Sequence, residues 1–214
     1  MLHIKLYFYK SIDLIFRLSD FFNFKSIIKS FKRFLERIYT LWILHNLGSN
    51  NSNICIRRTS KFIGEKNIHI GPESIIEKNC CIEAIEEYAG NKYNPIIKIG
   101  KNVHIGEYNH LTAINSIIIK DGVLTGRRVT ISDNNHGSYD KKELNIKPSD
   151  RKLSSKGSVV IGENVWIGEN VCILSGVKIG KGCIVAANAV VTKNIPEYCM
   201  IAGVPAKIIR KTDN

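Results

Sequence analysis

Aliphatic residues recur every six positions in the C-terminal half of the chain, from Ile161 to Pro196 without a slip. The repeated positions are Ile161, Ile167, Ile173, Ile179, Val185 and Val191, and a second set follows four residues after each, at Val165, Val171, Val177, Cys183, Ala189 and Ile195. Neither the helical period of 3.6 nor strand alternation gives a strict six-residue spacing, whereas the hexapeptide β-helix repeat does. The pattern therefore predicts one short strand and one turn in each hexad.

Three hexads close one triangular coil, so each aliphatic side chain is expected to point into a prism and stack on its equivalent in the next coil. The same register appears upstream at Ile70, Ile76 and Ile82, at Ile99, Ile105 and Leu111, and after a two-residue offset at Ile119, Thr125 and Ile131. About five coils are expected, which would stand about 24 Å tall at roughly 4.8 Å between stacked strands. The flat side faces of such a prism favour association between subunits.

Residues 1–48 follow a different pattern and are predicted to form an amphipathic helical segment. Its apolar residues include Leu14, Leu18, Phe22, Phe31, Leu35 and Trp42, and lysines and arginines are interleaved with them. No uncharged apolar run is long enough for a membrane span, and no secretory cleavage site is visible. Two interpretations stay open: residues 1–45 rest on an anionic membrane surface, or they cap the open end of the solenoid or a neighbouring subunit.

Charge and cysteine content narrow the class of protein. The net charge of +12 is spread over the N-terminal segment, the 141–156 region and the C-terminus rather than forming one basic stripe, so no nucleic-acid partner is predicted. The six cysteines match neither a metal motif nor a disulfide framework, so a reduced, cytoplasmic protein without a metal is expected. The repeat domain is expected over 49–200, followed by a C-terminal tail over 201–214.

The six-residue pattern breaks at 86–95 and at 133–158, and both breaks are predicted to be projecting loops. Interruptions of a rigid repeat are common places for function. The second break contains His136, which follows a predicted strand exit and precedes Gly137, where the chain can bend. Histidine has an ordinary pKa of about 6.5, so His136 is a candidate general base. His104 and His110 are six residues apart and are expected on successive faces of the prism.

These features resemble the hexapeptide-repeat acyltransferases, in particular the galactoside and maltose acetyltransferases and the O-acetyltransferases of bacterial surface polysaccharides. The resemblance rests on the repeats from residue 99 onward, the stretch from Asp133 to Gly137, and the tail from Ile201 to Arg210. It covers about two thirds of the chain. It implies an all-β solenoid, a left-handed parallel β-helix, assembled as a homotrimer with active sites between adjacent subunits.

The resemblance also implies roles for individual residues. His136 corresponds to the catalytic histidine, and the donor is acetyl-CoA. The positions that contact the pantetheine arm and phosphates correspond to Glu169, Ala187, Thr192, Lys193, Lys207 and Arg210, and Trp166 lines the cleft or packs on a neighbour. Glu169 replaces a serine and Lys207 an arginine of the family pattern, and a lysine keeps a charge for phosphate without the bidentate fork.

For the acceptor, the sequence indicates a sugar or glycan hydroxyl bound by Asn109, Thr112, Asn115, Asp133 and Tyr139. The apolar and basic N-terminal segment suggests a glycan made near the inner face of the membrane. Several alternatives remain: an amino-sugar N-acetyltransferase or antibiotic acetyltransferase of the same fold, a zinc-dependent carbonic-anhydrase-like trimer using His69, His104, His110 and His136, and a noncatalytic solenoid scaffold.

Overall fold

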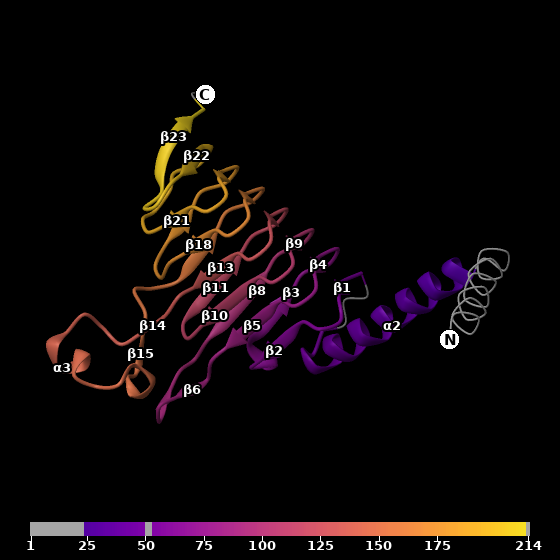
Figure 1. Cartoon of the computed structure of the whole chain (residues 1–214), viewed down its shortest axis with the longest axis horizontal. Coiled ribbons are helices and arrows are strands. Elements are labelled where there is room, and N and C mark those ends of the chain that lie inside the picture. The colour runs from indigo at the N-terminus through magenta and orange to yellow at the C-terminus, as the bar shows by residue number, and fades with distance from the viewer. Residues whose placement is uncertain (1–23, 50–52, 213–214) are drawn as a thin grey trace, which may run out of the picture. The chain divides into compact units, whose positions relative to one another are not determined.

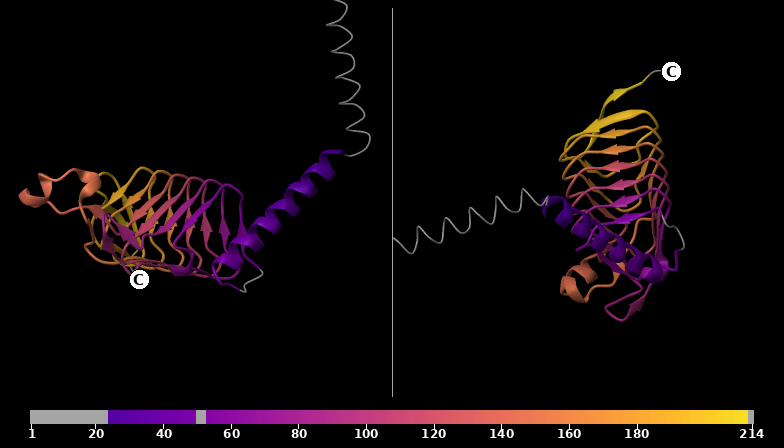
Figure 2. Two further views of the ribbon diagram at one scale, coloured as in Figure 1. Left: turned by 90° about the horizontal axis from the view of Figure 1, so that it is seen from below. Right: turned by 90° about the vertical axis from the view of Figure 1, so that its right-hand side faces the viewer.

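The computed structural model describes residues 24–49 and 53–212, and the chain divides into two compact units between Ile38 and Tyr39. The unit beginning at Tyr39 contains a three-sided prism in which each coil adds one short strand to each of three parallel sheets (Figure 1). Figure 2 shows the stacked coils from two further sides. The prism is a left-handed β-helix of hexapeptide repeats, as the sequence predicted.

The three faces of the prism are named here by the order in which the chain visits them. The first face contains β1 (Cys55–Ile56), β4 (Ile75–Ile76), β9 (His104–Ile105), β12 (Leu124–Thr125), β17 (Trp166–Ile167), β20 (Ile184–Val185), β22 (Cys199–Ala202) and the antiparallel β23 (Lys207–Lys211). The second contains β2 (Lys61–Ile63), β5 (Cys81–Ala84), β10 (His110–Ala113), β13 (Thr130–Ser132), β18 (Cys172–Ile173) and β21 (Val190–Val191). The third contains β3 (Ile68–Ile70), β8 (Ile96–Ile99), β11 (Ser116–Ile119), β16 (Val159–Ile161) and β19 (Lys178–Ile179).

One inward side chain from each strand stacks in a column beneath its face. The columns are Ile56, Ile76, Ile105, Thr125, Ile167, Val185 and Ile201 under the first face, Phe62, Ile82, Leu111, Ile131, Ile173 and Val191 under the second, and Ile70, Ile99, Ile119, Ile161, Ile179 and Ile195 under the third. All of these side chains are buried. Since burial of an aliphatic side chain contributes about 1.5–3 kcal/mol, these columns are the main source of stability.

The described residues contain six coils, one more than the spacing predicted. The additional coil begins at β1 and brings Ile56 and Phe62 into the core. A 3₁₀ turn at Glu65–Asn67 lengthens its third side, so the spacing from Phe62 to Ile70 is not six residues. Because of this insertion, the strict six-residue spacing did not predict the first coil.

Both interruptions leave the prism at the corner between the second and third faces. The first follows β5 and forms a hairpin of β6 (Glu87–Tyr88) and β7 (Asn91–Lys92). The second follows β13 and contains β14 (Asn135–His136), α3 (Lys141–Leu144), a 3₁₀ turn at Pro148–Asp150 and β15 (Leu153–Ser154). β6 and the loop that carries α3 project from the same side of the prism in Figure 1.

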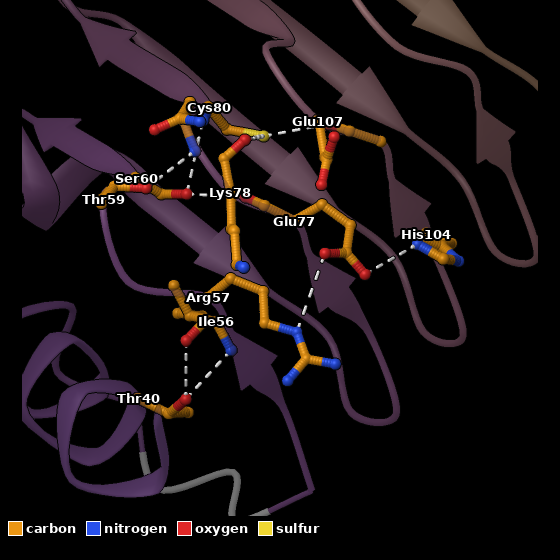
Figure 3. Close-up of polar contacts among 12 residues, drawn as sticks. Thr40, Ile56, Arg57, Thr59, Ser60, Glu77, Lys78, Cys80, His104 and Glu107 are labelled. Carbon is orange, nitrogen blue, oxygen red and sulfur yellow. Dashed lines mark hydrogen bonds and ion pairs between the residues drawn. The ribbon is translucent and has the colours of Figure 1, made fainter. Parts of the chain in front are cut away.

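The helix α2 (Phe24–Asn46) ends on the first coil, where its final turns cap the core. Ile43, Leu44 and Leu47 are buried in the core cluster. The Thr40 hydroxyl accepts a hydrogen bond from the backbone N–H of Ile56 and donates one to its carbonyl, both at 3.0 Å (Figure 3). Residues 39–47 therefore form the cap that one interpretation predicted, whereas the predicted helical positions in 1–23 lie outside the described residues.

Large apolar side chains along α2 are exposed to solvent. They are Ile27, Ile28, Phe31, Phe34, Ile38, Leu41 and Trp42. Their spacing of three, four and seven residues places them on one helix face, as in an amphipathic helix. In the part of the chain that the structure describes, no helix has both the length and the apolar character needed to span a membrane.

We expect Ile131→Ala to destabilise the prism by about 2–5 kcal/mol, because Ile131 is fully buried and its truncation leaves a cavity between stacked coils. Urea unfolding of both proteins measures the change. The matched control is Leu124→Ala on the first face, where the side chain is 44% exposed and the change should stay within about 0.5 kcal/mol. Equal effects of the two substitutions would contradict the assignment of inward and outward positions.

Candidate active site

His136 lies in the stem of the second loop, where it is exposed to solvent. β14 and β15 pair in antiparallel fashion and set His136 opposite Leu153. Gly137 follows with φ of +85°, and a Cβ atom there would lie 2.8 Å from Cδ of Arg151. The predicted bend after the histidine is therefore present, and a glycine is suited to it both by conformation and by space.

The two loops contact each other at this histidine. The rings of Tyr88 and His136 meet edge to face, with their centroids 5.2 Å apart and their planes at 71°. The Tyr93 hydroxyl accepts a hydrogen bond from the backbone N–H of Leu153 at 2.8 Å and donates one to its carbonyl at 3.2 Å. The first hairpin thus supports the strand opposite His136 as well as the imidazole itself.

Asp133 and Thr112 hold the base of the loop. The carboxylate of Asp133 is fully buried and accepts hydrogen bonds from the backbone N–H groups of Ile114 and Asn115, each at 2.8 Å. The Asn134 side-chain amide donates to the Thr112 carbonyl at 3.1 Å and to its hydroxyl at 3.3 Å. Two residues that the sequence suggested for the acceptor are therefore engaged in fixing the strand that leads to His136.

The remaining predicted acceptor residues divide between the interior and the surface. Asn109 is 1% exposed, and its side-chain amide donates to the carbonyls of Gly106 at 2.7 Å and Gly126 at 2.8 Å. It therefore joins consecutive coils inside a corner. Asn115 is exposed at the corner from which both loops leave, and Tyr139 is 98% exposed beyond His136. Only these last two have side chains that a ligand could reach.

The residues that the family resemblance assigned to coenzyme A are exposed and occupy the C-terminal coils. Glu169 and Ala187 stack at the corner between the first and second faces, where the N–H of Asn188 donates to the Glu169 carbonyl at 2.8 Å. Trp166 lies on the first face, and Lys207 and Arg210 lie on β23 at its edge. Thr192 and Lys193 are at the corner from which His136 also departs.

The other histidines on the prism do not gather around one point. His69 lies on the third face, His104 on the first and His110 on the second, so within one chain they cannot form the histidine cluster of a carbonic-anhydrase-like site. His104 Nε2 lies 3.5 Å from Glu77 Oε1, and Arg57 Nε lies 3.7 Å from Glu77 Oε2 (Figure 3). The placement of His104 and His110 on successive faces confirms the prediction from their spacing.

Tyr88, Tyr93 and Asn134 are site residues that the sequence analysis did not single out. The positions of the two breaks in the repeat could have indicated that the tyrosines lie near His136. Each break follows the second strand of a coil, so both must leave at the same corner.

The hexapeptide repeats match a known family model, "Bacterial transferase hexapeptide (six repeats)", over residues 158–193. This match and the prism place the repeat region in the class of hexapeptide-repeat transferases.

Individual relatives agree with this class. WbbJ of Escherichia coli (strain K12), named for O-acetyl transfer in lipopolysaccharide biosynthesis, is 46% identical over 54% of this chain and 61% of its own length. Galactoside O-acetyltransferase of the same strain is 34% identical over 54% of this chain and 57% of its own. The chain thus spans about three fifths of these curated relatives.

A solved structure adds a ligand-bound example of the fold. The hexapeptide-repeat acetyltransferase of Vibrio cholerae O1 biovar eltor, crystallised with acetyl coenzyme A, is 29% identical. The match covers 68% of this chain and 72% of that chain, with a TM-score of 0.57.

We expect Tyr93→Phe to loosen the strand opposite His136, because the substitution removes the hydroxyl that both accepts from and donates to Leu153. A hydrogen bond of this kind contributes about 0.5–1.5 kcal/mol, so amide hydrogen exchange at Leu153 should accelerate by up to about tenfold. Tyr139→Phe is the matched control, since that ring is almost fully exposed. Unchanged exchange at Leu153 in the Tyr93 variant would show that the hairpin does not hold the loop.

Proposed function

We propose that this chain is an acetyl-CoA-dependent O-acetyltransferase that acetylates a sugar hydroxyl of a bacterial surface glycan, with His136 as the general base. The observation that carries the proposal is the exposed imidazole at the stem of a braced loop on a hexapeptide-transferase prism. The similarity to WbbJ and to the galactoside enzyme supports O-acetyl transfer to a glycan. Acetyl coenzyme A in the Vibrio cholerae structure supports the donor.

The chemistry requires a base that later returns its proton. His136 takes the proton of the acceptor hydroxyl while that oxygen attacks the thioester carbonyl. The resulting tetrahedral oxyanion is stabilised by hydrogen-bond donors of the cleft. When the carbon–sulfur bond breaks, the imidazolium gives its proton to the leaving thiolate, so acetylated sugar and free coenzyme A are formed. General-base assistance of this kind contributes about 10²–10⁴ in rate.

The donor site is proposed along the C-terminal coils. Lys193, Lys207 and Arg210 supply cationic groups for the nucleotide phosphates, Thr192 and Trp166 line the cleft, and Glu169 and Ala187 offer backbone groups at their corner. In one chain the second face separates the corner of Glu169 and Ala187 from the corner that bears His136. A site that joins both therefore needs two copies, which supports the proposed homotrimer.

The acceptor is proposed to approach His136 from the exposed side of the loop. Asn115 offers a polar side chain at the same corner, and the exposed Tyr139 ring suits the apolar face of a sugar. Asp133, Thr112 and Asn109 are assigned supporting roles, because their polar groups are engaged within the prism.

We expect His136→Ala to lower kcat by about 10²–10⁴ while the affinity for coenzyme A is unchanged, because the imidazole acts on the acceptor hydroxyl rather than on the nucleotide. Thiol release from acetyl-CoA, measured with sugars, nucleotide sugars, amino sugars and bacterial glycan extracts, gives the rates. Binding of coenzyme A is measured separately by calorimetry. Undiminished turnover in the variant would contradict the assignment of the base.

We expect Arg210→Ala to weaken coenzyme A binding by at least tenfold. The substitution removes one charged contact to phosphate, which contributes about 1.5–3 kcal/mol. Lys211→Ala is the matched control, because neighbouring strand residues point to opposite sides of β23.

In the assay with different acceptors, acetyl transfer to amino sugars alone would contradict the proposed O-acetylation and indicate N-acetylation instead.

We further propose that the protein is cytoplasmic and that α2 holds it against the inner face of the membrane. The exposed apolar side chains from Ile27 to Trp42 share one face, and the helix also presents the exposed cations Lys29, Lys32, Arg33 and Arg37. An apolar face with adjacent cations matches an anionic lipid surface. A second copy is a poorer partner, since it would bring the same positive charges.

We expect the full chain to sediment with vesicles that contain anionic phosphatidylglycerol and much less with pure phosphatidylcholine. The double variant Phe31→Ser, Phe34→Ser should reduce this binding by at least tenfold, because each buried phenylalanine contributes about 1.5–3 kcal/mol. Leu144→Ser, which changes an exposed residue outside α2, should bind as the unmodified chain does. Equal sedimentation of both variants, or no sedimentation of the full chain, would contradict membrane contact through α2.

A further inference from the structure

Three side chains of the kinds that bind transition metals project from neighbouring strands of the second face. Cys81 and Glu83 belong to β5, and His110 belongs to the adjacent β10, where it pairs directly with Cys81. Ile82 and Leu111 beside them are fully buried. Because side chains alternate along a strand, Cys81, Glu83 and His110 all point to the outside of the prism.

The ligand atoms of this cluster are as close as those around one ion. Cys81 Sγ lies 3.2 Å from Glu83 Oε1, and His110 Nε2 lies 3.3 Å from Glu83 Oε2. One ligand atom from each of the three residues can be chosen so that all lie within 4.8 Å of one another. In a tetrahedral zinc site with bonds of about 2.0–2.3 Å, the ligand atoms are roughly 3.3–3.7 Å apart. Small rotations of the side chains would therefore be enough to surround an ion.

We propose that Cys81, Glu83 and His110 form a binding site for zinc. A thiolate, a carboxylate and an imidazole are the three ligand types that zinc uses, whereas calcium and magnesium prefer oxygen ligands alone. Three protein ligands leave the fourth tetrahedral position for a water molecule. The side chains of Glu83 and His110 are 25% and 44% exposed, so an ion can enter from solvent. On binding, the Cys81 thiol releases its proton to solvent as the sulfur–zinc bond forms.

The expected consequence is a cross-link between the second and third coils. β5 and β10 are consecutive strands of the second face, and an ion held by both adds to their backbone hydrogen bonds. The same β10 strand carries Thr112, which accepts from the Asn134 amide at the base of the loop that bears His136. The ion thus lies on the strand that anchors this loop. The inference is independent of acetyl transfer, because it concerns binding alone.

Metal binding by the untagged full chain tests the proposal. After treatment with a chelator, the protein should take up one zinc ion per chain, and its thermal midpoint should rise because the ion binds only the folded state. Cobalt in place of zinc should give the ultraviolet charge-transfer absorption of a cobalt–thiolate bond. Cys81→Ser should abolish that absorption and weaken zinc binding at least tenfold, and His110→Ala should weaken zinc binding to a similar extent.

Cys172→Ser is the matched control. Cys172 occupies the same outward column of the second face three coils beyond Cys81, where it pairs with Thr130 and Val190 instead of with a histidine. This variant should keep the zinc, the absorption and the thermal shift. Zinc binding that survives Cys81→Ser unchanged, or an unmodified chain that binds no zinc at micromolar concentration, would overturn the proposal whether or not the chain transfers acetyl groups.

Discussion

The stacking of one inward side chain on the next, along each of three columns, is the interaction on which the rest of the structure depends. Most strands of the prism have only two to four residues, too few to be stable alone, and each is held by its neighbours in the stack. Ile56, Ile76 and Ile105 on the first face show the consequence, since each must return to the same position in its own coil. Additional residues can therefore leave only where the chain turns.

This constraint brings the two interruptions together. Residues 86–95 and 133–158 are distant in sequence but leave the same corner two coils apart, and the coil between them passes that corner without an insertion. Tyr88 can therefore reach His136, and Tyr93 can reach Leu153. The register also brings Cys81 beside His110, twenty-nine residues later, because the first insertion lengthens that coil. Rules for metal motifs look for short spacings, so they did not detect this pair.

The sequence predicted the fold because its inward positions are aliphatic and evenly spaced. It predicted the bend at Gly137 and indicated His136 as a candidate because both stand in an interruption, but it could not separate polar residues that face solvent from those that face the chain. Asn109 and Asn115 are both corner asparagines, yet only the first has its side chain inside. The Asn109 amide donates to backbone carbonyls inside the corner, and the exposed Asn115 amide donates to the Ser158 hydroxyl at 3.5 Å, so the residue type carries no information about which arrangement applies.

Contacts with the first hairpin hold the second loop at its stem, whereas its outer part is held by its own contacts, such as the hydrogen bonds from Arg151 to the carbonyls of Leu144 and Ile146. The hydrogen bonds of Tyr93 contribute about 0.5–1.5 kcal/mol each, and an edge-to-face ring pair contributes a similar amount. Ordering one residue of backbone costs about 1–2 kcal/mol, so these contacts can fix only the few residues around His136. The exposed Tyr139 lies beyond them. Such a division suits the proposed acetyl transfer, because the proposed base must be held in position while a nearby surface adapts to a bulky acceptor.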